Sequence, residues 1–252
     1  MKLSSKNYPY LLFFFLFSSC GLYRQNVVNT PLFESKNELQ IGGHLSTNGY
    51  DAQASYSLTN KIGILLNYTN LGVKRKEYSL INYTIDKHSF GEFGTGYYRK
   101  NKNGFTQEYF LLVGQGFSSR YATGGSVFTD SSSATTPYYS DFNSLYYNRY
   151  TLQSDFGKSN GPLTYVFTPR LFLLNFYGIK DFKTDQTNVI ARTYVWSDLS
   201  LTVRYNFLNY FTLSSQMGLT LPVTGIHDSY FQSSPVNLSL GVLVHFNKKS
   251  KI

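Results

Sequence analysis

Carboxylates that could act as a pair are the first feature of this sequence that suggests chemistry. Glu92 and Glu108 fall on the inward face of two neighbouring predicted strands, and paired carboxylates can carry out general acid–base catalysis. Arginines occupy the same kind of position, so we favour an ion-pair network that fills a narrow interior. The expected network consists of Asp51, Glu92, Glu108, Arg149, Arg170, Asp198 and Arg204.

Histidines are the other candidates for catalysis or metal binding, and the sequence has 4 of them. His44 and His245 take inward positions in the first and last predicted strands, which would be neighbours in a closed barrel. They fall toward opposite ends of those strands, so we expect a separation of roughly 20 Å or more at a rise of about 3.3 Å per residue. The sequence therefore predicts no metal site and no cofactor.

A hydrolase site is the third possibility. His227, Asp228 and Ser229 supply the residue types of a catalytic triad. Consecutive residues cannot form a triad by themselves, because a triad is defined by its geometry. We assign no catalytic residue, and a hydrolase at the rim of a membrane barrel stays an alternative to a non-enzymatic role.

The N-terminus has the features of an export signal. Lys2 and Lys6 precede the apolar run at 10–17, which is too short for a transmembrane helix of about 20 residues. The following Phe-Ser-Ser-Cys-Gly resembles a bacterial lipobox, which implies cleavage after residue 19 and lipid on Cys20. A plain secretory signal with an incidental cysteine is the alternative. Because Cys20 is the only cysteine, no disulfide can form within the chain.

The chain then divides into three further parts. Residues 20–37 are polar and have no period, and we interpret them as a lipidated N-terminus with a tether, or as a segment tucked inside a lumen. Residues 38–247 are predicted to form the barrel. Residues 248–252 make a basic C-terminal tail. The signal peptide, 1–19, is expected to be removed.

The composition favours strands and an unusual surface. Aromatic residues make up 18% of the chain, with 23 Tyr and 21 Phe, while charged residues make up only 15%. A soluble domain averages about 25% charged residues, so the low value indicates a surface that faces something other than water. The net charge of +9 suits contacts with anionic lipid head groups, and no nucleic-acid recognition motif accompanies it.

From Glu38 onward, apolar and polar residues alternate with a period of two, and turn residues separate the runs. We predict an all-β, antiparallel, up-and-down transmembrane β-barrel of about 10 strands, with 12 as the alternative. An even number is what single-chain bacterial barrels require. The predicted strands are 38–46, 50–58, 61–70, 88–99, 104–119, 142–157, 161–177, 192–207, 210–222 and 235–247.

The predicted connections differ in length between the two ends. Asn48-Gly49 predicts a tight hairpin turn. Residues 76–86 could be a hairpin arm or an extension of a strand above the membrane. The predicted periplasmic turns are 59–60, 100–103, 158–160 and 208–209. The predicted outer loops, most of them long, are 46–50, 71–87, 120–141, 178–191 and 223–234.

A soluble barrel and an outer-membrane barrel share this period and differ in which face is apolar. An export signal and strands of about ten residues, which match a tilted span, favour the membrane. The polar face is also rich in Gly, Ser, Thr, Asn and Gln rather than in charges. A closed barrel would satisfy every backbone hydrogen bond within lipid.

The last predicted strand alternates apolar residues and ends on an aromatic one. Val242, Val244 and Phe246 resemble the C-terminal assembly signal of bacterial outer-membrane barrels. With Pro-Leu-Phe at 31–33 and Asn-Glu-Leu-Gln at 37–40, the chain is similar to small outer-membrane β-barrel proteins of Bacteroidota-type bacteria. The resemblance implies the outer membrane of a Gram-negative bacterium, with outer-membrane lipid and the barrel-assembly machinery as partners.

The long predicted loop at 120–141 joins Gly, Ser and Thr to aromatic residues. Tyr with Ser and Gly makes adaptable contact surfaces, and loops on rigid scaffolds often carry function. We therefore expect a scaffold, adhesin or subunit of a larger complex with other envelope proteins. A narrow transport conduit is the alternative. The expected contact residues are Arg120, Tyr121, Phe128, Tyr138 and Tyr139.

Overall fold

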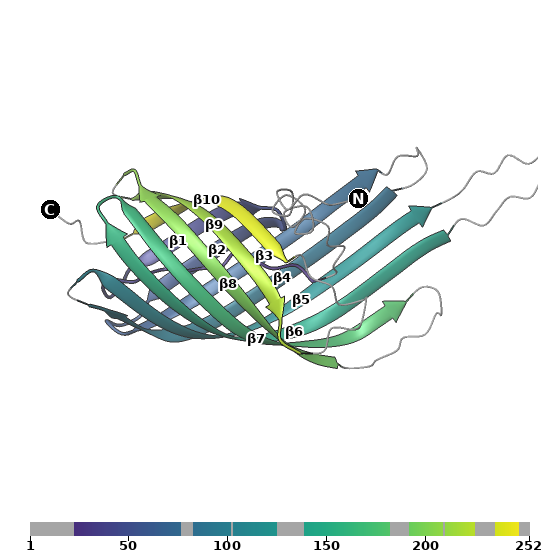
Figure 1. Cartoon of the computed structure of the whole chain (residues 1–252), viewed down its shortest axis with the longest axis horizontal. Coiled ribbons are helices and arrows are strands. Elements are labelled where there is room, and N and C mark those ends of the chain that lie inside the picture. Colours follow the sequence, from purple (N-terminus) through teal and green to yellow (C-terminus); the bar gives the residue numbers. More distant parts are fainter. Residues whose placement is uncertain are drawn as a thin grey trace, which may run out of the picture.

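The computed structural model is a closed barrel in which each strand pairs with its neighbours in sequence and β1 pairs with β10 (Figure 1). The 10 strands that it describes are all antiparallel, which confirms the predicted fold class. Within the described ranges, no helix is long and apolar enough to cross a membrane. These ranges are 23–76, 83–101, 103–124, 139–181, 192–208, 210–224 and 235–246.

The strands agree in position with the predicted alternation, but those in the middle of the chain are longer than expected. β1, β2, β9 and β10 have 8 to 12 residues, whereas β4 to β7 have 18 to 22. The strands are β1 (Leu39–Ser46), β2 (Gly49–Ser57), β3 (Ile62–Lys76), β4 (Tyr83–Lys100), β5 (Phe105–Gly124), β6 (Tyr139–Asn160), β7 (Leu163–Asp181), β8 (Arg192–Asn206), β9 (Phe211–Pro222) and β10 (Val236–Phe246).

Two tight turns differ from their predicted positions by one to three residues. Ser46 pairs with Gly49, so the first hairpin turns on Thr47 and Asn48 rather than on Asn48-Gly49. Gly49 instead opens β2 with a φ of 128°, where a Cβ atom would collide with the backbone oxygen of Asn70. Likewise, β6 and β7 are joined at 161–162 instead of 158–160, with the positive φ of 59° taken by a glycine.

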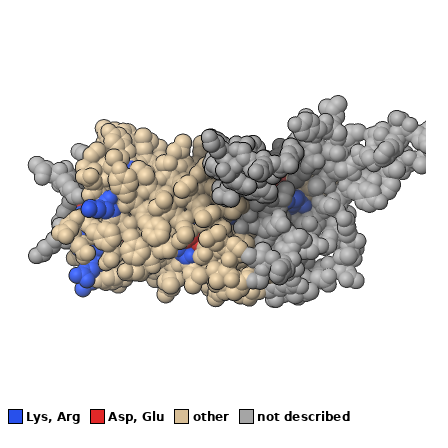
Figure 2. All heavy atoms as spheres, viewed as in Figure 1, with Lys and Arg blue, Asp and Glu red and all other residues tan. Residues whose placement is uncertain are grey.

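The two faces of the wall have inverted polarity compared with a soluble protein. Large apolar side chains point outward and are exposed, among them Leu45 (75%), Leu111 (67%) and Leu240 (68%). Polar and charged side chains point inward and are buried, as Gln153 and Asp198 are. On the face in Figure 2, Lys and Arg lie mainly toward the short-turn end and leave most of the described wall uncharged. A closed sheet with this polarity is a transmembrane β-barrel.

A row of polar residues marks where the apolar wall ends. Gln115, Asn148, Asn175 and Thr193 are in register across β5 to β8 and belong to the outward face. Gln115 lies 10 residues beyond Phe105, the start of β5. A tilted membrane strand needs about 9–11 residues. β4 to β7 therefore continue well past the membrane, and Figure 1 shows them projecting beyond the short strands.

These extensions shorten the predicted outer loops. β3 reaches Lys76 and β4 begins at Tyr83, so both ends of 76–86 extend strands and add no new one. The predicted bounds of the loops at 71–87, 120–141 and 178–191 are wrong, because strand pairing continues beyond the apolar wall. The ion pair between Arg120 and Asp86, at 2.7 Å, joins directly opposed residues in this extension.

Candidate functional site

An extended stretch of the N-terminal chain fills the lumen of the barrel. Residues 23–37, which we call the lumen segment, precede β1 and form no regular element beyond a single bridge at Tyr23. All of residues 23–31 are buried, and so is Phe33. The sequence left a tether and a lumen placement open, and the described residues take the lumen.

Amide side chains of the wall satisfy the main chain of the lumen segment. Gln216 accepts from the Val28 N–H at 2.7 Å and donates to the Val28 carbonyl at 3.0 Å. This one side chain supplies both hydrogen bonds that a neighbouring strand would make. Gln53 donates to the Val27 carbonyl at 2.9 Å. Because buried main-chain groups need partners, these amides let an unpaired extended chain pass through the barrel.

Carboxylates of the wall accept from the remaining N–H groups. The two oxygens of Glu108 accept from Leu32 N–H at 2.9 Å and from Phe33 N–H at 2.7 Å. Asp51 accepts from Val27 N–H at 3.0 Å. Both oxygens of Glu108 therefore accept hydrogen bonds from one end of the lumen segment. This carboxylate is then not free to act as a general acid or base.

Further wall residues reach the middle of the segment. The Gln153 amide donates to the Asn29 carbonyl at 2.8 Å. Arg204 donates to the Thr30 hydroxyl at 2.8 Å. Contacts to the lumen segment therefore come from β2, β5, β6, β8 and β9, all around the barrel.

Four of the seven expected network residues meet around Asn26. Arg149 lies 2.6 Å from Glu92, and Arg170 lies 2.5 Å from Asp198 and 3.9 Å from Glu92. The Asn26 amide nitrogen donates to Glu92 at 3.0 Å, and its oxygen accepts from Arg149 at 2.9 Å. All five side chains belong to residues that are 3% exposed or less. The other three expected members each contact the lumen segment separately and are Asp51, Glu108 and Arg204.

Tyr23 holds the upstream end of the lumen segment in an aromatic cluster. Its ring centroid lies 5.6 Å from that of Tyr147, 6.0 Å from Phe172 and 5.9 Å from Trp196. Its hydroxyl accepts from Arg149 at 2.8 Å, which links the cluster to the charge network. Packed aromatic rings therefore fill the lumen at one level, and paired charges fill it at the next.

Several residues in this arrangement were absent from the predicted set. Asp155 lies directly opposite Glu108 and accepts from Thr168 at 2.7 Å. Asp86 accepts from both Arg24 and Arg120. The alternation placed Asp155 and the amides below on the inward face, whereas Asp86 fell in the predicted loop 71–87, and nothing in the sequence indicated which residues would bind the segment. The amides that it passed over are Gln53, Gln153 and Gln216.

The predicted loop surface lies partly in strands. Arg120 and Tyr121 belong to β5, and Tyr139 begins β6, so their assignment to a loop is wrong. The cause is the strand extension past the polar row. The Arg120 guanidinium is also paired with Asp86 at 2.7 Å, and this ion pair joins β5 to β4.

The register brings His44 and His245 closer than expected. His44 lies opposite Gly241 and His245 opposite Gln40, a difference of 4 positions along the pair. At about 3.3 Å per residue this is about 13 Å, and the predicted separation of roughly 20 Å or more is wrong. The prediction put the two residues at opposite ends of a full span, whereas the register leaves only 4 positions between them. Across the described ranges, no group of three or more His, Cys, Asp or Glu side chains could hold a metal ion.

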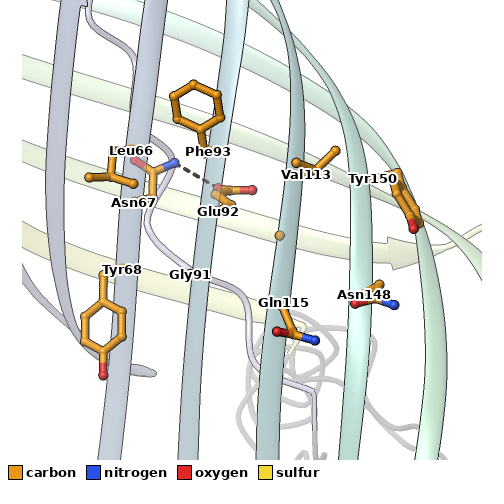
Figure 3. Close-up of a pocket in the computed structure, with 11 residues that line it drawn as sticks. Leu66, Asn67, Tyr68, Gly91, Glu92, Phe93, Val113, Gln115, Asn148 and Tyr150 are labelled. Carbon is orange, nitrogen blue, oxygen red and sulfur yellow. Dashed lines mark hydrogen bonds between the residues drawn. The ribbon is translucent and has the colours of Figure 1, made fainter.

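A shallow groove crosses the outer wall beside the charge network (Figure 3). Tyr68 and Tyr150 stand on its two sides, and Gly91 leaves the space between them open. Asn67 and Glu92 point inward from the same wall and share a hydrogen bond of 2.9 Å. The β-ladder runs unbroken beneath the groove, so the groove faces lipid and does not open into the lumen.

Some predicted features lie outside the described residues: Cys20, the 1–19 signal, Phe128, Tyr138, the histidine and aspartate at 227–228, and the 248–252 tail. The residues of the expected assembly signal are described. Val242 and Phe246 point outward and are exposed, Val244 is half-buried on the same face, and Phe246 ends β10.

No protein-family model matches the chain, and a search of curated proteins found no match. Solved structures of outer-membrane barrels are similar at low identity. The translocator domain of the autotransporter NalP from Neisseria meningitidis is 10% identical, with a TM-score of 0.47 over 84% of this chain and 87% of that one. Ail of Yersinia pestis is 10% identical, with a TM-score of 0.34 over 85% and 100%. A loop-deletion mutant of OmpT, an outer membrane protein of Vibrio cholerae, is 9% identical, with a TM-score of 0.27 over 84% and 99%.

Proposed function

We propose that this protein is an outer-membrane β-barrel of a Gram-negative bacterium, closed by its own lumen segment, and that it acts as a non-enzymatic scaffold. The observation that carries the proposal is the burial of residues 23–31 with their main chain bound by wall side chains. A lumen occupied in this way has no path for solutes. We therefore do not propose the narrow transport conduit that the sequence left as an alternative.

The outer membrane is supported by the exposed apolar wall and by the chain ends. Leu39 at the start of β1 pairs with Phe246 at the end of β10, so both ends of the barrel lie on the side of the short turns. Bacterial outer-membrane barrels have this arrangement, with short turns and both ends in the periplasm. In this orientation, the long ends of β4 to β7 project outside the cell.

The scaffold role is supported by the rigidity of this extension. Phe117 and Tyr146 have ring centroids 4.9 Å apart, and Tyr146 and Tyr177 have centroids 6.0 Å apart. The Gln115 amide donates to the Tyr177 hydroxyl at 2.5 Å. These outward rings belong to three strands, so they form a fixed surface that suits another envelope protein. We also propose lipid on Cys20 and recognition of the β10 end by the assembly machinery.

Conductance in planar lipid bilayers tests the closed lumen. The intact protein should show no steady channel, whereas a variant lacking residues 23–36 should conduct, because removing the lumen segment leaves a water-filled path. A variant truncated only upstream of Tyr23 is the matched control and should stay closed. Conduction by the intact protein equal to that of the deletion variant would overturn the proposal.

A second route avoids a deletion that prevents folding. Lys36 and Asn37 are exposed at the short-turn end, so a protease site between them can be cut in the folded barrel. Washing the cut protein with denaturant, and then measuring conductance, should reveal the pore. A cut and washed barrel that has lost the segment and still does not conduct contradicts the proposed role of the segment as the closure.

Photo-crosslinking tests the scaffold surface. A photoreactive phenylalanine at Tyr146, which is 43% exposed beyond the polar row, should give one defined adduct with an envelope protein in cells. The same group at Tyr165, which is 50% exposed near the short turns, is the control and should crosslink only to lipid. Identical adducts from both positions, or none from Tyr146, would count against the scaffold.

A further inference from the structure

We infer that the lumen segment runs through the whole barrel and carries the chain that precedes Tyr23 to the outer face of the membrane. The inference rests on the orientation in the proposed function, and it adds a role for the lumen as a passage that brings the N-terminal end of the mature chain, with the lipid proposed on Cys20, to that face. The lumen thus binds an extended polypeptide main chain, which here is supplied by the protein itself.

The downstream end of the lumen segment is fixed among the short turns. Glu34 forms an ion pair with Lys100, the last residue of β4, at 2.8 Å. The Lys36 N–H donates to Asn60, in the connection between β2 and β3, at 3.2 Å. Both partners lie at the end of the barrel where β1 begins. Residue 37 is therefore at the periplasmic mouth.

The upstream end is fixed at the opposite mouth. The Gln25 carbonyl accepts from Asn48 at 3.0 Å and from Asn237 at 3.2 Å. Asn48 lies in the turn between β1 and β2, and Asn237 lies near the start of β10, both at the far end of the barrel. Arg24 pairs with Asp86 at 3.1 Å, on the part of β4 that extends past the polar row.

Distances along β4 show that the segment has no slack. Its partners at the two ends, Lys100 and Asp86, are 14 residues apart on this strand, which is about 46 Å along the strand at about 3.3 Å per residue. Residues 24–34 can span about 35 Å when fully extended. A strand tilt of about 40° reduces the axial distance to about the same value. The chain therefore crosses once and cannot turn back.

The contacts between these ends follow the chain in order. Glu108, 3 residues into β5, holds Leu32 and Phe33 near the periplasmic mouth. Glu92, toward the polar row, holds Asn26 near the other mouth. Most contacts in between address the main chain, as the two hydrogen bonds from Gln216 do. These contacts thus select the direction of the polypeptide main chain more than the identity of its side chains.

An epitope inserted directly before Tyr23 tests the inference in intact cells. Antibody should bind it without permeabilisation. The same epitope in the connection between β5 and β6 is the control for the outer face, and the same epitope after Phe246 is the control for the periplasmic face. We expect the first two epitopes to be labelled on intact cells and the third only after permeabilisation.

Each other outcome overturns the inference. Labelling before Tyr23 only after permeabilisation places the upstream chain in the periplasm. Labelling in neither state, with the epitope present on a denaturing blot, buries that chain within the molecule. If the epitope after Phe246 is labelled on intact cells and the one between β5 and β6 only after permeabilisation, the orientation in the proposed function is refuted instead. Conductance of the same variants reports separately on closure, so the inference can fail while the barrel stays closed.

Discussion

Replacing Arg149 with methionine removes one of the cations that join the wall to the lumen segment. The Arg149 guanidinium lies 2.6 Å from Glu92, donates to Tyr23 and Asn26 at 2.8 Å and 2.9 Å, and belongs to a residue that is 1% exposed. Removing one partner of a buried ion pair costs about 3–5 kcal/mol, because the other charge stays buried. Arg170, 3.9 Å from Glu92, offsets part of this loss. We therefore expect a loss of about 3 kcal/mol in the free energy of unfolding.

Urea unfolding in lipid vesicles measures this loss. Trp196 is the only tryptophan of the chain and touches the Tyr23 ring, so its fluorescence reports on the lumen directly. A loss of about 3 kcal/mol lowers the folding equilibrium constant more than a hundredfold. Lys100→Met is the matched control. It breaks the partly exposed pair with Glu34, and such a pair contributes only about 0–1 kcal/mol.

The double variant Arg149→Met/Glu92→Met separates charge from packing. It removes the carboxylate that the single variant leaves without its main partner, so it should recover part of the lost stability. The reasoning is refuted when Arg149→Met changes stability no more than Lys100→Met does. It is equally refuted when the double variant is as unstable as the sum of its two single variants.

Two further variants probe the downstream half of the lumen segment. Glu108→Ala should raise amide hydrogen exchange at Leu32 and Phe33 about two- to tenfold, because an intramolecular hydrogen bond contributes about 0.5–1.5 kcal/mol; unchanged exchange by mass spectrometry would contradict it. Gly63→Ala should cost about 1–3 kcal/mol in urea unfolding, because the new Cβ would collide with the Phe33 ring. Gly72→Ala, with nothing within 4 Å of the new atom, should be neutral, and equal midpoints for the two would exclude a tight fit of Phe33.

The strands could be predicted because each residue of the wall has one of two distinct environments. In β9 every second residue is buried in the lumen from Thr212 to Thr220, and the residues between them face lipid. Alternation of this strength fixes both the strand and its register. Past the polar row the alternation breaks down, since the consecutive residues Ser118 and Ser119 are both buried. The run of Gly, Ser and Thr after Arg120 therefore predicted a loop from its first residue, whereas β5 continues to Gly124.

The filling of the lumen was harder to predict, because the lumen segment has no period of its own. Its main chain is bound by side chains such as Gln216, and no neighbouring strand imposes an alternation on it. Asn26 shows the limit. It lies between two arginines and a glutamate, yet nothing near it in the sequence distinguishes it from Asn29. The partners come from residues more than 60 positions away, which only the closed barrel brings together.

The single crossing of the lumen makes the barrel and its N-terminal chain mechanically interlocked, like a ring on an axle. The lumen segment is joined to β1 at the periplasmic mouth, so it cannot leave through the outer mouth. Retreat the other way would draw everything upstream of Tyr23 back through the ring, and a bulky group on that chain would act as a stopper. The seam between β1 and β10 is the place where the ring closes. Closing it around a chain already in place is the simplest order of events, so the lumen segment would template the last step of folding.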